Sequence, residues 1–214
     1  RVERRRLLPA DGRRMSPDLD WIRARLRRYE RIPGHLPQFG DDIDNFDTGL
    51  LGALTPAAVL VPVIARREPP LLFTKRNASL RKHPGQVAFP GGRLDPGEDA
   101  VRAALREAEE ETALPPRHVE VVAPIDDYAT GTGFRVTPVV GIIPPDLALS
   151  PHEAEVESLF EVPLDYVLDA SKHERRTGEW KGRERTFYVI PWPGGDIWGA
   201  TAGMVVNLAR ILTQ

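Results

Sequence analysis

The chain has 214 residues, 41% of them hydrophobic and 28% charged, with a formal net charge of −2 at pH 7 and no cysteine. This length supports one well-buried core and is rather short for two. The near-neutral charge gives no global attraction to nucleic acid or to an anionic membrane, and the lack of cysteine excludes disulfides, thiolate nucleophiles and zinc–sulfur sites.

The beginning of the chain is its most basic part, with eleven arginines against five acidic residues in the first 31 positions. Ser16-Pro17 is a typical helix start, so we expect a helix at about residues 16–30. Arg23, Arg27 and Arg28 should lie on its solvated face. Its buried stripe should consist of Leu19, Ile22 and Leu26.

The rest of the chain alternates strand and helix patterns. Apolar runs predict strands at residues 57–65, 71–75, 86–90, 119–124, 134–143 and 156–162. A short helix at 163–169, a hairpin closed by 183–190 and a final helix at 200–212 should follow. This alternation favours an α/β fold with a mixed β-sheet between helices.

Three glutamates of one predicted helix, Glu107, Glu110 and Glu111, are spaced to meet on one edge. At 3.6 residues per turn, Glu110 lies about 60° to one side of Glu107 and Glu111 about 40° to the other. Like charges at this spacing destabilise a helix unless a cation lies among them, and hard cations such as Mg²⁺ prefer oxygen ligands. The cluster therefore predicts a metal site, although a solvated acidic face is the ordinary reading of a bare acidic run.

The residues around the glutamates are consistent with such a site. An apolar stripe, made of Val101, Ala104, Leu105 and Ala108, should press the helix against a sheet. The turn signal Asp95-Pro96-Gly97 predicts that residues 92–98 form a loop leading into the helix. Arg106 should tie this loop to the helix by holding Glu98 through two parallel hydrogen bonds.

The register of these residues resembles the Nudix box. Gly92 is followed after five residues by Glu98, after seven more by Arg106-Glu107, and then by Glu110-Glu111. The resemblance implies a Nudix-type α/β/α sandwich at residues 51–214, with residues 1–50 as an N-terminal extension. One position departs from the pattern, because Ala113 stands where the family usually has glycine. A left-handed residue at this helix end costs about 1 kcal/mol more for alanine than for glycine.

A second, narrower resemblance is to the coenzyme A diphosphatase branch of the Nudix hydrolases. The segment before the box matches that branch at Leu71, Thr74, Arg76, Arg81, Gly85, Phe89, Pro90, Gly91 and Gly92. Asn77 breaks the pattern, where serine or alanine is usual. Further matches occur at residues 133–138, 155–156, 162–164 and 197–201. Arg76, Arg81 and Lys82 are the candidate phosphate-binding cations, since a guanidinium offers two aligned donors to phosphate.

The resemblance implies hydrolysis of the diphosphate of coenzyme A to 3′,5′-ADP and 4′-phosphopantetheine, with Mg²⁺ or Mn²⁺ as cofactor. The implied metal ligands are Gly92, Glu107, Glu110 and Glu111. Glu98 and Arg106 complete the implied catalytic set. A general base must take the proton of the attacking water, and either Glu110 or Glu155 could serve. Glu153 and Glu157 compete with Glu155 for this role.

Two other functions stay open at this stage. One is a Nudix hydrolase of another nucleoside diphosphate derivative, such as NADH, ADP-ribose or a nucleotide triphosphate. The other is a catalytically silent Nudix domain that acts as a ligand sensor or a nucleic-acid-binding regulator, although none of the box's charged residues is missing. We expect a small-molecule substrate and neither a nucleic-acid nor a membrane partner, and a homodimer is left open. The lack of cysteine and of a secretory signal favours a cytoplasmic protein.

Overall fold

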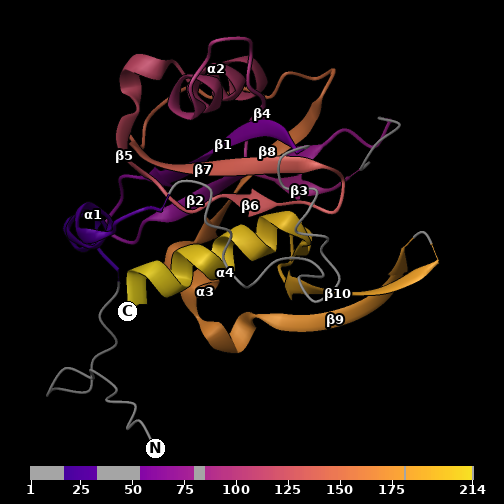
Figure 1. The fold of residues 1–214 in the computed structure, drawn as a ribbon. Coiled ribbons are helices and arrows are strands. Elements are labelled where there is room, and N and C mark those ends of the chain that lie inside the picture. The colour runs from indigo at the N-terminus through magenta and orange to yellow at the C-terminus, as the bar shows by residue number, and fades with distance from the viewer. Residues whose placement is uncertain (1–16, 33–53, 80–84, 181, 214) are drawn as a thin grey trace, which may run out of the picture.

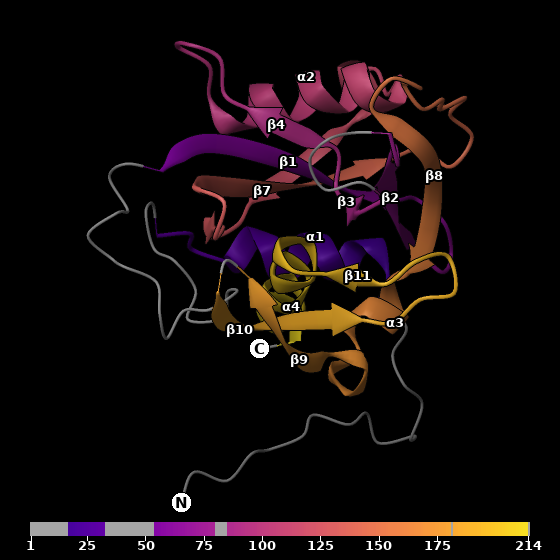
Figure 2. The ribbon, with the colours of Figure 1, turned by 90° about the vertical axis from the view of Figure 1, so that its right-hand side faces the viewer.

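The computed structural model describes residues 17–32, 54–79, 85–180 and 182–213, which form three layers. A mixed sheet lies between helix α2 on one face and helices α1 and α4 on the other (Figures 1 and 2). The expected α/β/α sandwich is therefore confirmed.

The elements have the following bounds. The helices are α1 (Leu19–Arg28), α2 (Ala100–Thr112), α3 (Leu164–Leu168) and α4 (Ala200–Thr213), with 3₁₀ turns η3 (Pro116–His118) and η4 (Ala170–Lys172). The strands are β1 (Thr55–Ile64), β2 (Pro70–Arg76), β3 (Val87–Ala88), β4 (Gly91–Arg93), β5 (Glu120–Pro124), β6 (Tyr128–Ala129), β7 (Phe134–Ile143), β8 (Val156–Pro163), β9 (Glu174–Trp180), β10 (Arg183–Ile190) and β11 (Ile197–Trp198).

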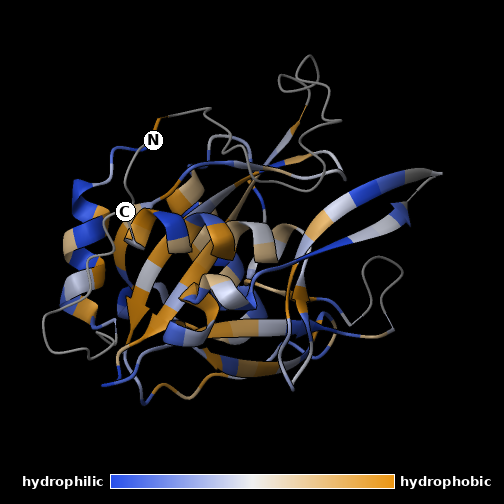
Figure 3. Cartoon of the chain, turned by 90° about the horizontal axis from the view of Figure 1, so that it is seen from below, coloured by the Kyte–Doolittle hydropathy of each residue, from blue (hydrophilic) through white to orange (hydrophobic). Residues whose placement is uncertain are grey.

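The main sheet is mixed because β1 and β7 run parallel while its other pairs are antiparallel. Its central order is β3-β2-β1-β7-β5, with β4 and β8 paired to β1 and β2. Alternate residues of β1 face opposite layers: Ala58 and Leu60 pack toward α2, whereas Val61 and Val63 pack toward α1 and α4. Both faces are covered, which explains the nearly continuous apolar runs of these strands (Figure 3).

The structure corrects two expectations about the strands. The predicted strand at 86–90 is shortened to β3, because Pro90 has no N–H to continue the ladder and its carbonyl instead accepts from Leu60 at 2.9 Å. The predicted loop at 92–98 begins within the strand β4. The hairpin closed by 183–190 is confirmed, but it belongs to a separate three-stranded sheet, β11-β10-β9.

Helix α1 is part of the main core. Ile22 and Leu26 are each 1% exposed, as the predicted stripe requires. The helix is capped by Asp18, whose carboxylate accepts from the Trp21 N–H at 2.7 Å, and not by the predicted Ser16-Pro17, of which Ser16 lies outside the described residues. Arg23 is not simply solvated, because it holds both carboxylate oxygens of Glu120. The domain boundary at residue 50 stays a prediction.

None of the helices in the part of the chain that the structure describes is long and apolar enough to cross a membrane. Helix α4, the longest of them, has 14 residues. Its buried residues contribute to the same core as Ile22 and Leu26.

Helix α2 ends in a conformation that is unfavourable for its residue. Ala113 follows the last helical turn with φ 55° and ψ 27°, and it is the one non-glycine residue with positive φ in the described ranges. Its N–H donates to the Glu109 carbonyl at 2.9 Å. The left-handed helix end expected from the sequence is therefore confirmed, and alanine occupies it at a conformational cost.

We expect Ala113→Gly to raise the free energy of unfolding by about 1 kcal/mol, because glycine adopts positive φ without the Cβ clash. The melting temperature should rise by about 2–4 °C, measured by thermal and urea denaturation. Ala103→Gly, inside the same helix and 0% exposed, is the matched control and should lower stability by about 1 kcal/mol. Equal destabilisation by both substitutions would contradict the assignment.

Candidate active site

Arg106 joins the loop before α2 to the helix. Its Nε and Nη2 donate to the two carboxylate oxygens of Glu98 at 3.1 and 3.0 Å, and Nη2 also donates to the Arg93 carbonyl at 3.0 Å. The same guanidinium holds the pKa of Glu98 below its usual range, helped by the Asp95 N–H. The predicted two-point pairing of Arg106 with Glu98 is confirmed.

The third nitrogen of Arg106 faces the acidic cluster itself. Nη1 lies 2.9 Å from a carboxylate oxygen of Glu107 and 3.4 Å from one of Glu110. A cation therefore does lie among the glutamates in this conformation, and it belongs to the protein. This offsets the repulsion between charges three residues apart on one helix edge.

Glu111 is the buried member of the cluster, only 6% exposed. It accepts a hydrogen bond from the Gly91 N–H at 3.2 Å, which ties the end of α2 to β4. The pKa of Glu111 is raised to about 7, chiefly by burial and also by the carboxylates of Glu107 and Glu155, against the opposing effect of Gly91 and Arg76.

Glu107 lies directly against the backbone of β4. A side chain on Gly92 would overlap the carboxylate of Glu107, so only glycine permits this approach. Burial raises the pKa of Glu107, while its contact with Arg106 lowers it. The strand and the helix thus bring together the backbone of Gly92 and the side chains of Glu107 and Glu111.

Glu155 reaches the cluster from a different part of the chain. Its loop is fastened to the end of α2, because His152 N–H donates to the Glu111 carbonyl at 2.9 Å. Asn77 fastens the same loop to β2: its N–H donates to the Glu155 carbonyl at 2.9 Å and its side-chain amide to the Glu153 carbonyl at 2.8 Å. The residue that departs from the coenzyme A diphosphatase pattern therefore has a structural role here.

The two competitors of Glu155 have different surroundings. Glu157 forms an ion pair with Lys75 at 2.9 Å. Glu153, like Glu155, is exposed. Only Glu155 of the three contributes to the raised pKa values of Glu107 and Glu111, so its carboxylate is electrostatically the nearest of the three to the cluster.

Of the predicted phosphate-binding cations, only Arg76 can be placed. It ends β2, and its positive charge lowers the pKa of Glu111. Arg81 and Lys82 lie outside the described residues. One cation of the predicted set is therefore close to the buried carboxylate.

The donor set fits a hard divalent cation in its chemistry. It offers several carboxylate oxygens, one of them buried, beside a closely packed strand backbone. Within the described ranges, no three acidic or histidine side chains are arranged to hold one ion. The reason is visible in the contacts of Arg106, which engages Glu107 and Glu110 at once. Metal binding here requires these two side chains to exchange their contacts with Arg106 for contacts with the ion.

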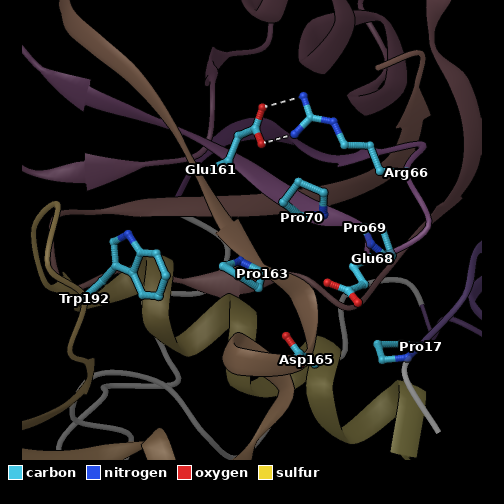
Figure 4. A pocket seen from close by; sticks show the side chains of 9 residues that line it. All are labelled: Pro17, Arg66, Glu68, Pro69, Pro70, Glu161, Pro163, Asp165 and Trp192. Atoms are coloured by element: carbon cyan, nitrogen blue, oxygen red, sulfur yellow. Dashed lines mark hydrogen bonds and ion pairs between the residues drawn. The ribbon is translucent and has the colours of Figure 1, made fainter. Parts of the chain in front are cut away.

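Two cavities are formed by other described residues, and neither is lined by a predicted site residue. One, of about 450 Å³, is lined by the Arg66–Glu161 ion pair, several prolines and Trp192, and contains none of the predicted site residues (Figure 4). The other, of about 460 Å³, includes Gln86, Arg185, Phe187 and Trp198. Sequence reasoning singled out Trp198 within a matching segment but missed Arg185 and Phe187. These two residues lie on a hairpin outside the matching segments, and no sequence pattern around them indicates that they line a cavity.

Comparison with known proteins agrees with this geometry. A NUDIX domain family matches residues 54–184. The protein named "Uncharacterized Nudix hydrolase NudL" from Enterobacter sp. (strain 638) is 46% identical over 154 residues, which cover 72% of this chain and 80% of that protein. NudL from Cronobacter sakazakii is 47% identical over the same shares.

A solved structure shows the same fold. The crystal structure of a Nudix hydrolase from M. smegmatis, RenU, superposes with a TM-score of 0.52 at 22% identity. The match covers 73% of this chain and 84% of that one. At this identity the likeness concerns the fold alone.

The buried carboxyl of Glu111 should make the stability of the metal-free protein depend on pH. Folding raises its pKa from 4.5 to about 7, so the folded state binds this proton more tightly than the unfolded state. The stabilising contribution is fully present below pH 4.5 and is lost as pH rises through about 7. The full difference is on the order of 3 kcal/mol.

Glu111→Gln keeps an acceptor for the Gly91 N–H but removes the titration. We expect the free energy of unfolding of this variant, relative to that of wild type, to increase by a few kcal/mol between about pH 5 and pH 8, measured by urea denaturation with EDTA present. Two parallel stability curves would contradict the assigned pKa.

Proposed function

This chain belongs to the Nudix family, and from that premise we propose that it hydrolyses the diphosphate of coenzyme A, releasing 3′,5′-ADP and 4′-phosphopantetheine. The observation that carries this proposal is the position of Arg76. It comes from the segment that resembles the coenzyme A diphosphatase branch, and its charge acts on the buried carboxylate of the box helix. A phosphate-binding cation beside metal-binding carboxylates suits a diphosphate substrate.

Nudix hydrolases generally use divalent metals such as Mg²⁺ or Mn²⁺. In this chain the proposed ligands are the Gly92 carbonyl and the carboxylates of Glu107, Glu110 and Glu111. When bound, the ion would neutralise the diphosphate and lower the pKa of a bound water. Glu111 must be ionised to act as a ligand, so ion binding should weaken as pH falls below about 7.

Arg106 and Glu98 are proposed to position the site. Their paired hydrogen bonds hold β4 and the following loop against α2. This keeps the Gly92 backbone at the carboxylate of Glu107, where a longer side chain has no room. Because three of the guanidinium's contacts are to Glu98 and Arg93, Arg106 can retain them when Glu107 and Glu110 turn away.

Glu155 is the proposed general base, with Glu110 as the alternative. Glu155 is exposed, its loop is fixed to both α2 and β2, and its charge reaches Glu107 and Glu111. A carboxylate fixed in this way can accept the proton of the attacking water. Glu110 is 59% exposed and touches Arg106, so it is available once that contact is released.

Arg76 is proposed to hold a phosphate of the substrate, together with Arg81 and Lys82 from the segment that follows. A planar guanidinium can give two parallel hydrogen bonds to one phosphate. In this role Arg76 would also favour the ionised form of Glu111, since its charge lowers that pKa.

The substrate assignment is tested with steady-state rates on coenzyme A, NADH, ADP-ribose and nucleotide triphosphates, with Mg²⁺ and with Mn²⁺. We expect coenzyme A to have the highest kcat/KM, and Glu110→Gln to lower turnover by about 10³-fold or more. Comparable efficiency on ADP-ribose would favour a broader Nudix hydrolase. Salt-dependent nucleic-acid binding without any hydrolysis would favour a silent regulatory domain.

The loop of Glu155 offers matched controls for the assignment of the base. Glu155→Gln should lower kcat by about 10²- to 10⁴-fold, because the proton acceptor is lost. Glu153→Gln and Glu157→Gln carry the same change on the same segment and should alter kcat by less than about threefold. If Glu155→Gln leaves kcat unchanged, Glu110 is the general base.

A further inference from the structure

The second cavity has a wall built from three separate parts of the chain. It is bounded by Gln86 before β3, by the turn between β6 and β7, and by the β9–β10 hairpin with β11 and the start of α4. Figure 2 shows these elements on the side of the molecule that faces the viewer. The volume of about 460 Å³ is within the range of small-molecule sites.

Trp198 gives this cavity an aromatic wall. It is 40% exposed, and it is the one large aromatic side chain so exposed among the described residues. Its ring centroid lies 6.0 Å from that of Phe187, at an interplanar angle of 59°. The indole of Trp198 therefore contacts Phe187 and remains partly accessible to a ligand.

The backbone holds Trp198 in place. It pairs with Val189 in the β10–β11 ladder, and the next residue, Gly199, donates to the Tyr188 carbonyl at 3.0 Å. Two residues further on, the Thr201 hydroxyl donates to the Val87 carbonyl at 3.1 Å. A rigid aromatic surface loses little conformational entropy when a ligand stacks on it.

Polar groups lie around this aromatic wall. The Arg185 guanidinium is pressed against Gly131, where any side chain would overlap it. Glu179 contributes an exposed carboxylate, and the hydroxyls of Thr130 and Thr132 lie 3.0 Å apart. A flat aromatic ligand with hydrogen-bonding groups at its edge matches this lining better than a flexible aliphatic chain does. Its face can stack on the indole, and its edge groups can hydrogen-bond to the polar side chains.

The cavity lies close to the acidic cluster. The Gln86 carbonyl accepts from the Arg76 N–H at 2.9 Å, and Arg76 acts electrostatically on Glu111. Gly92 comes six residues after Gln86, so the distance between their Cα atoms cannot exceed about 20 Å even in a fully extended chain. The cavity and the box helix are therefore joined by a short segment of the chain.

We propose that this cavity receives the adenine base of the substrate, stacked on Trp198, while the diphosphate of the same molecule lies at the carboxylates of α2. The assignment rests on the proposed function in that it takes the substrate to be an adenine nucleotide. It names Trp198 as a residue that determines specificity for the nucleotide half of the substrate.

The test compares the two halves of coenzyme A as separate ligands. Binding of 3′,5′-ADP and of 4′-phosphopantetheine to the full chain is measured by calorimetry with Mg²⁺ present. Trp198→Ala should weaken binding of 3′,5′-ADP by about 5- to 150-fold, the range for loss of one base–aromatic stack. Its affinity for 4′-phosphopantetheine should change by less than about twofold.

Two variants keep the result interpretable. Trp198→Phe retains an aromatic face and should restore most of the affinity for 3′,5′-ADP. Trp192→Ala removes a tryptophan from the other cavity (Figure 4) and should leave both affinities unchanged; the Trp192 ring centroid lies 5.0 Å from that of Tyr166. Thermal melts of each variant establish that it is folded.

An unchanged affinity of Trp198→Ala for 3′,5′-ADP would overturn the proposal. So would a loss confined to 4′-phosphopantetheine, which would assign the cavity to the pantetheine arm. The measurement also separates the two proposals. If 3′,5′-ADP binding depends on Trp198 but coenzyme A is not hydrolysed, only the proposed function is defeated. If coenzyme A is hydrolysed but Trp198→Ala leaves 3′,5′-ADP binding unchanged, only the adenine site is defeated.

Discussion

The repulsion among the carboxylates of α2 is the constraint on which the site depends. Three glutamates on one helix edge are stable only beside a positive charge, and here the guanidinium of Arg106 supplies it. The same guanidinium is fixed from the other side by Glu98 and the Arg93 carbonyl. One side chain therefore both holds the loop to the helix and keeps the acidic cluster compact.

Burial divides the glutamates into different chemical classes. Glu111 is almost fully enclosed and titrates near neutrality, whereas Glu110 is mostly exposed at the rim. A divalent cation bound as proposed would therefore compete with a proton for Glu111 near neutral pH. The cost of enclosing Glu111 is partly offset by the Gly91 N–H and the charge of Arg76. Both come from the strands that the coenzyme A-type motif forms.

The site was predictable where its residues are close in sequence. The spacing of Glu98, Arg106 and Glu107 determines their mutual positions through one helix and one turn, and the left-handed end at Ala113 was expected because the family pattern has glycine there. The interruption at Pro90 was missed because an apolar run alone does not reveal a lost ladder hydrogen bond. The contacts of Asn77 with the Glu155 loop were also beyond prediction, since they join segments 76 and 78 residues apart.

Chemistry and recognition are built in different ways in this fold, and this explains the limit of sequence reasoning. The acidic cluster lies on a single helix, so the residues that form it and position it fall within about twenty consecutive positions. The cavity of Trp198 is assembled from β3, the β6–β7 turn and the second sheet, and its shape depends on how these pack. If the cavity holds the base as proposed, substitutions on the β9–β10 hairpin would change which base or arm is bound while the carboxylates stay in place. Within one family, this separation allows a constant reaction to serve different substrates.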